Sequence, residues 1–286
     1  MTAGEPEIEI HQADSLEFLR RVPDASFELA YIDPPFNTGR PRKLRPMRVE
    51  RSDEGEGDRT GYAGRRYRAS WAGPEREFGD AFDDYIEFLG PRLVELRRVL
   101  TPAGSLIVHL DPRESHYVKV FLDGLFGRDS FQNEIVWAYD YGGRGRRRWA
   151  AKHDVLFWYT RDPRRYTFRY DDIDRVPYMA PKLVTPEKAR RGKVPTDVWW
   201  HTIVPPGGEE RTGYPTQKPL GIMTRIVRVH SNPGDRILDV FAGSGTTGEA
   251  AARCGRRAVL VDSNPEAIRV METRLAPWGP RLRDRY

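Results

Sequence analysis

The chain has 286 residues, 38% of them hydrophobic and 31% charged. This length fits one large α/β domain with an insertion, or two small domains, and we favour the first organisation. No run approaches the roughly 18 apolar residues of a membrane helix, and Met1–Glu5 lack the start of a signal peptide. These features predict a cytosolic (cytoplasmic) protein with no membrane contact.

Cys254 is the only cysteine, which excludes an intramolecular disulfide and a cysteine-based metal cluster. No neighbouring residue in sequence suggests an activating base, so a structural thiol is expected there, and no metal site is predicted. The formal net charge of +5 favours a polyanionic partner.

In chain order, apolar and alternating runs predict a series of strands, at 7–10, 27–32, 105–110, 134–139, 154–159, 236–240 and 258–261. Capped segments with helical spacing predict the helices between them, at 15–21, 84–100, 114–126, 219–230, 246–253 and 265–275. Strands that alternate with helices indicate an α/β fold with a mostly parallel, doubly wound sheet.

Two segments lack such periodicity. Residues 37–78 are rich in Gly and Arg and predict a long basic loop, and residues 161–211 collect Pro, Arg and Lys as an insertion outside the core would. The predicted organisation is therefore one half of the core at 1–160, the insertion at 161–211, and the other half at 212–286.

A glycine turn lies between the strand at 236–240 and the helix at 246–253. Gly243, Gly245 and Gly248 fit the pattern G-x-G-x-x-G, and Asp262 ends the next strand, where an acid can accept hydrogen bonds from ribose hydroxyls. Nicotinamide cofactors and S-adenosylmethionine both need such a turn. The short stretch after Asp262 has no room for the second half of a dinucleotide fold, which favours S-adenosylmethionine.

Asp33-Pro34-Pro35-Phe36 follows the apolar strand at 27–32, so it should emerge at the carboxyl end of the sheet, where open α/β sheets bind ligands. The successive prolines stiffen the backbone and leave carbonyl oxygens free to accept. The turn then offers a carboxylate, a carbonyl and an aromatic face. These suit a planar ring that carries an exocyclic amino group.

Asp33–Phe36 followed by Phe241–Gly245 resembles the DNA amino-methyltransferases, in the β-class order in which the catalytic motif precedes the cofactor motif. Asn133–Trp137, Lys152–Asp154 and Thr216–Pro219 resemble the same family. The resemblance covers the chain outside 37–78 and 161–211. It implies a seven-stranded, Rossmann-like, circularly permuted methyltransferase sheet with S-adenosylmethionine as cofactor and an inserted target-recognition region at 161–211.

The resemblance also implies site residues. Those that hold the target amino group are Asp33, Pro34, Pro35 and Phe36. Those that bind the cofactor are Asp14, Thr216, Lys218, Asp239, Phe241, Gly243, Gly245, Thr246, Thr247 and Asp262. Within this set, Thr216 and Lys218 are expected beside the methionine end and Asp14 beside the adenine.

The predicted reaction is direct attack of an exocyclic amino nitrogen on the sulfonium methyl, with the target base flipped out of the duplex. Asp33 is expected to act mainly as a hydrogen-bond acceptor. In the family, Asp in the first motif position leans towards N6-adenine, which is the predicted target, and N4-cytosine is the alternative. Less favoured are methylation of RNA or a protein amide, a non-catalytic DNA-binding module, and a nicotinamide oxidoreductase.

Double-stranded DNA is the predicted partner, and basic side chains are the candidate contacts. Expected at DNA are Arg40, Arg42, Lys43, Arg144, Arg146, Arg147, Arg190, Arg191 and Lys193. Base reading is expected from the insertion, 161–211. The sequence leaves open a homodimer, a cognate restriction endonuclease (a restriction-modification pair) and the recognition sequence.

Overall fold

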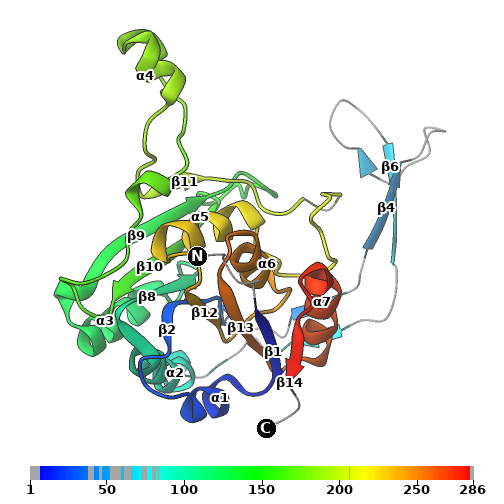
Figure 1. Cartoon of the computed structure of the whole chain (residues 1–286). Helices are drawn as coiled ribbons and strands as arrows, with labels where there is room; N and C mark the ends of the chain where they lie inside the picture. The colour runs from blue at the N-terminus through cyan, green and yellow to red at the C-terminus, as the bar shows by residue number, and fades with distance from the viewer. Residues whose placement is uncertain are drawn as a thin grey trace.

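The computed structural model describes residues 7–37, 42–44, 47–51, 59–60, 66–71, 76–78, 82, 84–205 and 207–283. One sheet organises this part of the chain, with the strand order β11-β9-β10-β8-β2-β12-β13-β1-β14 (Figure 1). Its strands are β1 (Ile8–Gln12), β2 (Phe27–Ile32), β8 (Leu100–Leu110), β9 (Phe131–Ala138), β10 (His153–Thr160), β11 (Val198–Trp200), β12 (Arg236–Asp239), β13 (Arg257–Asp262) and β14 (Arg281–Arg283).

β10 runs antiparallel to its neighbours β8 and β9, and the other pairs in the sheet are parallel. The seven predicted strands are therefore all present. The two additional strands, β11 and β14, were not predicted. Each has three residues, too few for a recognisable pattern, and each forms by pairing with the exposed edge of a longer strand.

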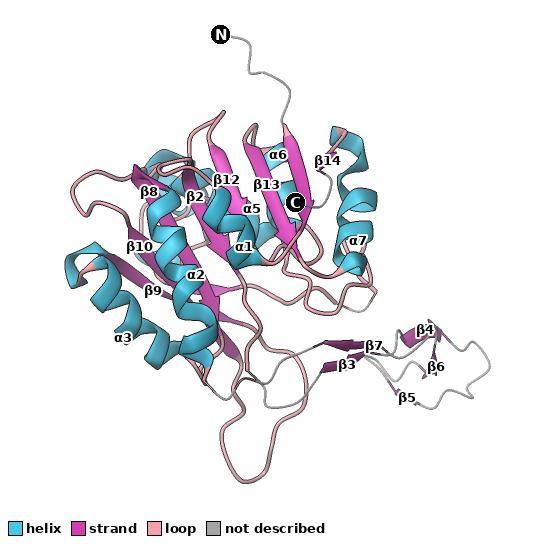
Figure 2. Ribbon diagram, turned by 90° about the horizontal axis from the view of Figure 1, so that it is seen from below, coloured by secondary structure: helices cyan, strands magenta, loops and turns pink. Residues whose placement is uncertain are grey.

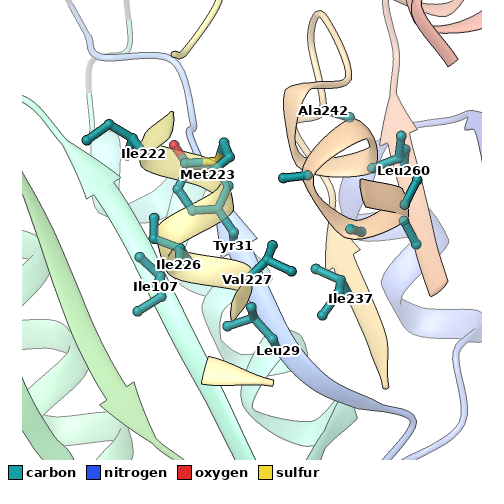
Figure 3. Close-up of a cluster of buried hydrophobic side chains, with 14 of the residues drawn as sticks. Leu29, Tyr31, Ile107, Ile222, Met223, Ile226, Val227, Ile237, Ala242 and Leu260 are labelled. Carbon is teal, nitrogen blue, oxygen red and sulfur yellow. The ribbon is translucent and has the colours of Figure 1, made fainter. Parts of the chain in front are cut away.

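Helices cover both faces of the sheet (Figure 2). On one face lie α1 (Ser15–Arg21), α2 (Tyr85–Val99) and α3 (Ser115–Phe126), and on the other α5 (Leu220–His230), α6 (Thr246–Arg253) and α7 (Pro265–Leu275). Strand residues alternate between the two cores because successive side chains point to opposite faces. Figure 3 shows Leu29 and Tyr31 of β2 packed against Ile226 and Val227 of α5.

β8 begins at Leu100, whereas Thr101–Gly104 were expected to form a turn before the strand. Leu100 pairs with Phe27 of β2, and the register shifts between Phe27 and Leu29. A proline is tolerated within a strand at such an irregularity. Pro102 can therefore lie inside the strand.

The prediction of a long loop for 37–78 is wrong at the positions where the structure describes short strands. These are β3 (Arg42–Leu44), β4 (Met47–Arg51), β5 (Arg59–Thr60), β6 (Arg66–Trp71) and β7 (Arg76–Phe78). They form two small antiparallel sheets, β3-β7 and β4-β6-β5, which Figure 2 shows apart from the main sheet. Arg66–Trp71 does alternate polar and apolar residues, but the surrounding Gly and Arg obscure that period.

The insertion at 161–211 has one short helix, α4 (Pro186–Arg191), which the sequence did not predict. Its N-cap is Thr185, whose hydroxyl accepts from the amide of Lys188 at 3.3 Å. Figure 1 shows α4 at the end of an extended arm that projects from the core. Along the described residues, every helix is too short or too polar to cross a bilayer.

The contact between α6 and β13 leaves no room for a side chain at Gly248. A Cβ there would lie 2.5 Å from Cδ1 of Leu260. We predict that Gly248→Ala lowers the free energy of unfolding by about 1–3 kcal/mol through overpacking. The matched control is Gly124→Ala in α3, where a Cβ meets nothing within 4 Å and helix propensity improves. Denaturant unfolding of both variants checks this, and equal stabilities would contradict it.

Candidate active site

The two sequence motifs meet at the carboxyl ends of two neighbouring strands. Ile237 and Leu238 of β12 pair in parallel with Leu29 and Ala30 of β2. The turns that follow, Asp33–Phe36 and Phe241–Gly245, therefore emerge at the same edge of the sheet. A cavity of about 360 Å³ lies there.

Most of the predicted catalytic and cofactor residues line this cavity. They are Asp14, Asp33, Pro35, Thr216, Lys218, Asp239, Phe241, Gly243, Thr246, Thr247 and Asp262. Pro34, Phe36 and Gly245 are not among its lining residues. Gly245 has φ of +74° and a Cβ there would meet Cγ of Met271 at 2.8 Å, so its position requires glycine for the backbone of the turn.

Asp262 is fixed by the backbone around the glycine turn. Its Oδ2 accepts from the amide of Gly243 at 2.8 Å, and its Oδ1 accepts from the amide of Asn264 at 2.9 Å. Burial raises the pKa of Asp262, and these two hydrogen bonds oppose that rise. The carboxylate is thus held rigidly at the cavity wall.

Asp239 lies at the end of β12 and is buried. Thr247 donates its hydroxyl to Oδ2 at 2.6 Å, and the amide of Phe241 donates to Oδ1 at 3.0 Å. Burial raises the pKa of Asp239 to about 7, although both hydrogen bonds oppose the shift. This carboxyl therefore holds the first turn of α6 against the end of β12.

Asp14 caps α1 and accepts from the amides of Leu16 and Glu17 at 2.8 and 3.1 Å. Nη2 of Arg92 donates to its second oxygen at 2.9 Å. Burial alone would raise the pKa of Asp14, but the amides and the Arg92 charge lower it. Arg92 also lies over the ring of Phe88, with its Cζ 4.2 Å from the ring centroid.

Asp33 connects the catalytic turn with the segment before α5. Its Oδ2 forms an ion pair with Nζ of Lys218. Its Oδ1 is buried and, within the described residues, receives no hydrogen bond. Nζ of Lys218 also lies 5.1 Å from the centroid of Phe36. Asp33 therefore lines the cavity and keeps one oxygen with unused acceptor capacity.

Sequence reasoning missed a buried group behind Asp33. His109 of β8 lies 3.4 Å from Asp33 Oδ1, and its other ring nitrogen lies 3.2 Å from Asp154 Oδ2 of β10. Tyr214, whose ring would touch a Cβ on Gly243 at 3.1 Å, was also missed, as was Arg92. The available signal for His109 was a polar residue within the otherwise apolar run 106–110.

The predicted DNA-contacting residues lie outside the cavity. Arg144, Arg146 and Arg147 are exposed in the connection between β9 and β10, where Arg144 pairs with Asp140. Arg190 and Arg191 are in the last turn of α4, and the backbone of Lys193 pairs with Val176 in the projecting arm. Arg42 and Lys43 are placed only as backbone in β3, and Arg40 lies outside the described residues.

Fold and cavity together define a cofactor-binding α/β protein with a ligand site at the switch point of the sheet. A family model for DNA methylases matches residues 27–273. The chain therefore belongs to the DNA methylase family. This confirms the resemblance to DNA amino-methyltransferases.

Individual relatives share about a third or less of their residues with this chain. The type II methyltransferase M.HpaI of Haemophilus parainfluenzae is 32% identical over 68% of this chain, and the chain spans 60% of the length of that relative. The DNA adenine methyltransferase YhdJ of Escherichia coli K12 is 27% identical over 93% of this chain and 82% of YhdJ.

Solved structures share the fold, which confirms the Rossmann-like architecture. A complex of M1.HpyAVI with SAM has a TM-score of 0.58 and 19% identity, covering 94% of this chain and 98% of M1.HpyAVI. The cytosine-N4-specific PvuII DNA methyltransferase has a TM-score of 0.64 and 15% identity, covering 95% of this chain and 88% of that enzyme.

The raised pKa of Asp239 predicts a pH-dependent stability. Folding favours the protonated carboxyl, so this contribution is fully present below about pH 4 and is lost as pH rises towards about 7. Between these values the free energy of unfolding should fall by up to about 1.4 kcal/mol per pH unit from this group. Asp239→Asn should remove that slope in denaturant unfolding without cofactor. Parallel curves for the two proteins would disprove the shift.

Proposed function

We propose that this protein transfers a methyl group from S-adenosylmethionine to the N6 amino group of an adenine flipped out of duplex DNA. The observation that carries the proposal is the Oδ1 of Asp33, a buried acceptor without a hydrogen bond among the described residues, at the wall of the cavity that the glycine turn also lines. An exocyclic amino group would supply the missing donor.

The charge of the cavity favours this cofactor. Four carboxyl groups line it, those of Asp14, Asp33, Asp239 and Asp262, against Lys218 and Arg92. S-adenosylmethionine carries a sulfonium and an ammonium group, which such a wall attracts, whereas the pyrophosphate of a nicotinamide cofactor would be repelled. When bound, S-adenosylmethionine supplies an electrophilic methyl group. We infer that Asp262 accepts from its ribose hydroxyls and that Asp14 lies at its adenine end.

The residues of the catalytic turn would orient the target nitrogen. Oδ1 of Asp33 and the carbonyl of Pro34 accept from the amino group, which directs the nitrogen lone pair away from the ring and towards the methyl. Because Oδ1 of Asp33 is buried, its hydrogen bond is stronger than in water. Phe36 is fixed by its edge contact with the ring of His109, at 5.5 Å between centroids, and we propose that it stacks on the base.

N6-adenine is the preferred target over N4-cytosine. Asp in the first motif position leans towards adenine, and the relative YhdJ, which aligns over 93% of this chain, is a DNA adenine methyltransferase. The structural similarity to the cytosine-N4-specific PvuII enzyme keeps N4-cytosine as the second candidate. Both amino groups present the same donors to Asp33.

We also propose that the projecting arm within 161–211 reads the DNA target, while the exposed arginines between β9 and β10 hold the phosphates. The start of β10 pairs with the end of β8, which runs parallel to β2. The connection from β9 to β10 therefore lies at the edge of the sheet that carries Asp33. A duplex held there would present its flipped base to the cavity.

Two substitutions separate the proposed roles of the acids. Asp33→Ala should reduce methyl transfer by about 100-fold or more while most of the cofactor affinity is retained, because three of the four carboxyl groups of the cavity remain but the acceptor for the target is lost. Asp262→Asn should weaken cofactor binding about 10- to 100-fold through loss of charge-assisted hydrogen bonds. Each variant is the control for the other in calorimetry with S-adenosylmethionine and in methylation of duplex DNA.

Mass spectrometry of the nucleosides from the methylated duplex identifies the product. The expected modification is N6-methyladenine, and N4-methylcytosine would establish the alternative. Near-normal turnover of Asp33→Ala would refute the role of this residue, and unchanged cofactor affinity of Asp262→Asn would remove that acid from the site.

The exposed arginines should contribute to DNA binding through phosphate contacts. The double variant Arg146→Ala/Arg147→Ala should lower the magnitude of the slope of log affinity against log salt by about 1 per lost contact. Arg269→Ala, an exposed arginine on α7, is the control and should leave the slope unchanged. Fluorescence anisotropy with labelled duplex at several salt concentrations measures this, and an unaltered slope in the double variant would exclude these contacts.

A further inference from the structure

His109 lies in a buried network directly behind the catalytic turn. Only 1% of its side chain is exposed, and its ring is flanked by Phe36 and Trp137, with both ring centroids at 5.5 Å. Nδ1 lies 2.9 Å from the hydroxyl of Tyr31 and 3.4 Å from Oδ1 of Asp33. Nε2 lies 3.2 Å from Oδ2 of Asp154. The imidazole thus lies between two carboxyl groups 121 positions apart in the chain, one in the turn after β2 and the other on β10.

The hydrogen-bond partners determine which nitrogen carries the proton. Asp154 is a carboxylate: burial would raise its pKa, but the hydrogen bond and charge of His109 and the charge of Lys218 lower it. Its Oδ2 therefore accepts from Nε2–H of His109. Tyr31 keeps its proton because burial raises the pKa of its hydroxyl far above the usual value, and in this tautomer the hydroxyl can donate to Nδ1. The tautomer with the proton on Nε2 leaves a lone pair on Nδ1, and this is the form that a relay through the ring requires.

We propose that His109 and Asp154 form a proton relay behind Asp33. The relay rests on the proposed methyl transfer. As the bond from nitrogen to methyl forms and the bond from sulfur to methyl breaks, the amino nitrogen becomes cationic and must lose one proton. Oδ1 of Asp33 takes this proton and passes it to Nδ1 of His109. The Asp154 carboxylate stabilises the resulting imidazolium, as the acid of a catalytic triad does.

The surroundings of the ring accommodate this change of charge. The Tyr31 hydroxyl can accept from Nδ1–H after the transfer, since a hydroxyl both donates and accepts. Tyr139 donates to Oδ1 of Asp154 at 3.2 Å and holds that carboxylate in place. Several ionisable groups face the ring directly or through one partner. Among the described residues they are Tyr31 and Asp33 from β2 and its turn, Tyr139 from the connection after β9, Asp154 from β10, Lys218 from the segment before α5, and Asp239 from β12, which acts on Tyr31. When the product leaves, the proton returns to Asp33 and exits through the cavity.

His109 is a positioning residue, because it contacts Asp33 and not the base, and one substitution separates relay from positioning. In His109→Asn the amide can still hydrogen-bond at the place of Nδ1, so Asp33 keeps its orientation, but the amide cannot take up a proton. We expect the single-turnover rate of methyl transfer to duplex DNA to fall by roughly 100-fold. Affinity for S-adenosylmethionine, measured by calorimetry, should be unchanged.

The pH profile of the single-turnover rate is the readout that a packing role would not move. In the unaltered protein the rate should fall on the acid side, because a relay that is already fully protonated cannot take up the proton of the amino group. His109→Asn should lose that limb. Asp154→Asn should shift it to lower pH, because removal of the negative charge disfavours the imidazolium.

The matched control is His230→Asn. His230 is also a buried histidine, 3% exposed, but it packs against Trp158 and Phe168 and lines a different cavity. Burial lowers its pKa to about 3, so it stays neutral across the range tested. Its substitution should leave the pH profile unchanged.

An unaltered rate and profile in His109→Asn would overturn the relay while leaving the methyltransferase proposal intact. If His109→Asn fails to bind the cofactor, the isosteric Asp154→Asn decides, and an unshifted limb in that variant overturns the relay. Absence of DNA methylation by the unaltered protein would instead refute the proposed function itself.

Discussion

The parallel pairing of β2 with β12 is the constraint on which the rest of the site depends. Both strands are buried and have helices on each face, so their register decides which side chains enter which core. A slip of one residue would move Leu29 and Tyr31 to the face of the sheet where Ala30 and Ile32 now pack, and the reverse. The observed register brings the turn at Asp33 beside the glycine turn, and the ion pair of Asp33 with Lys218 links that turn to the segment leading into α5.

Burying several acids around one cavity is unfavourable without a cationic ligand. The structure limits this cost in different ways for different acids. Asp14 has two amides and Arg92, whereas Asp239 has only neutral donors, and burial raises its pKa to about 7. Asp33 has Lys218, which holds one oxygen and leaves the other available. A sulfonium or ammonium group in the cavity would relieve the remaining desolvation. The same carboxyl groups whose burial costs folding free energy would thus favour the binding of a cationic cofactor.

Most of the core could be predicted because its elements carry local signals. The strands at Phe27–Ile32 and Arg257–Asp262 are apolar runs bounded by turn residues. Asp84 and Asn264 are helix caps, which can be recognised from the neighbouring residues alone. Elements that depend on a partner were missed. Val198–Trp200 becomes a strand only because the edge of β9 accepts it, and Pro186–Arg191 is too short for a period.

The chain by itself determined the two motifs, because a proline-stiffened acidic turn and a glycine turn are consequences of neighbouring residues, and their order pointed to the family that the comparisons confirm. Only the tertiary structure decided what surrounds them. Tyr31 meets His109, and Arg92 meets Asp14, each pair separated by 78 positions, and no spacing in the sequence announces such contacts. Hydrogen bonds between side chains require proximity in space. The first pair meets because β2 and β8 are neighbours in the sheet, and the second because α1 and α2 pack side by side.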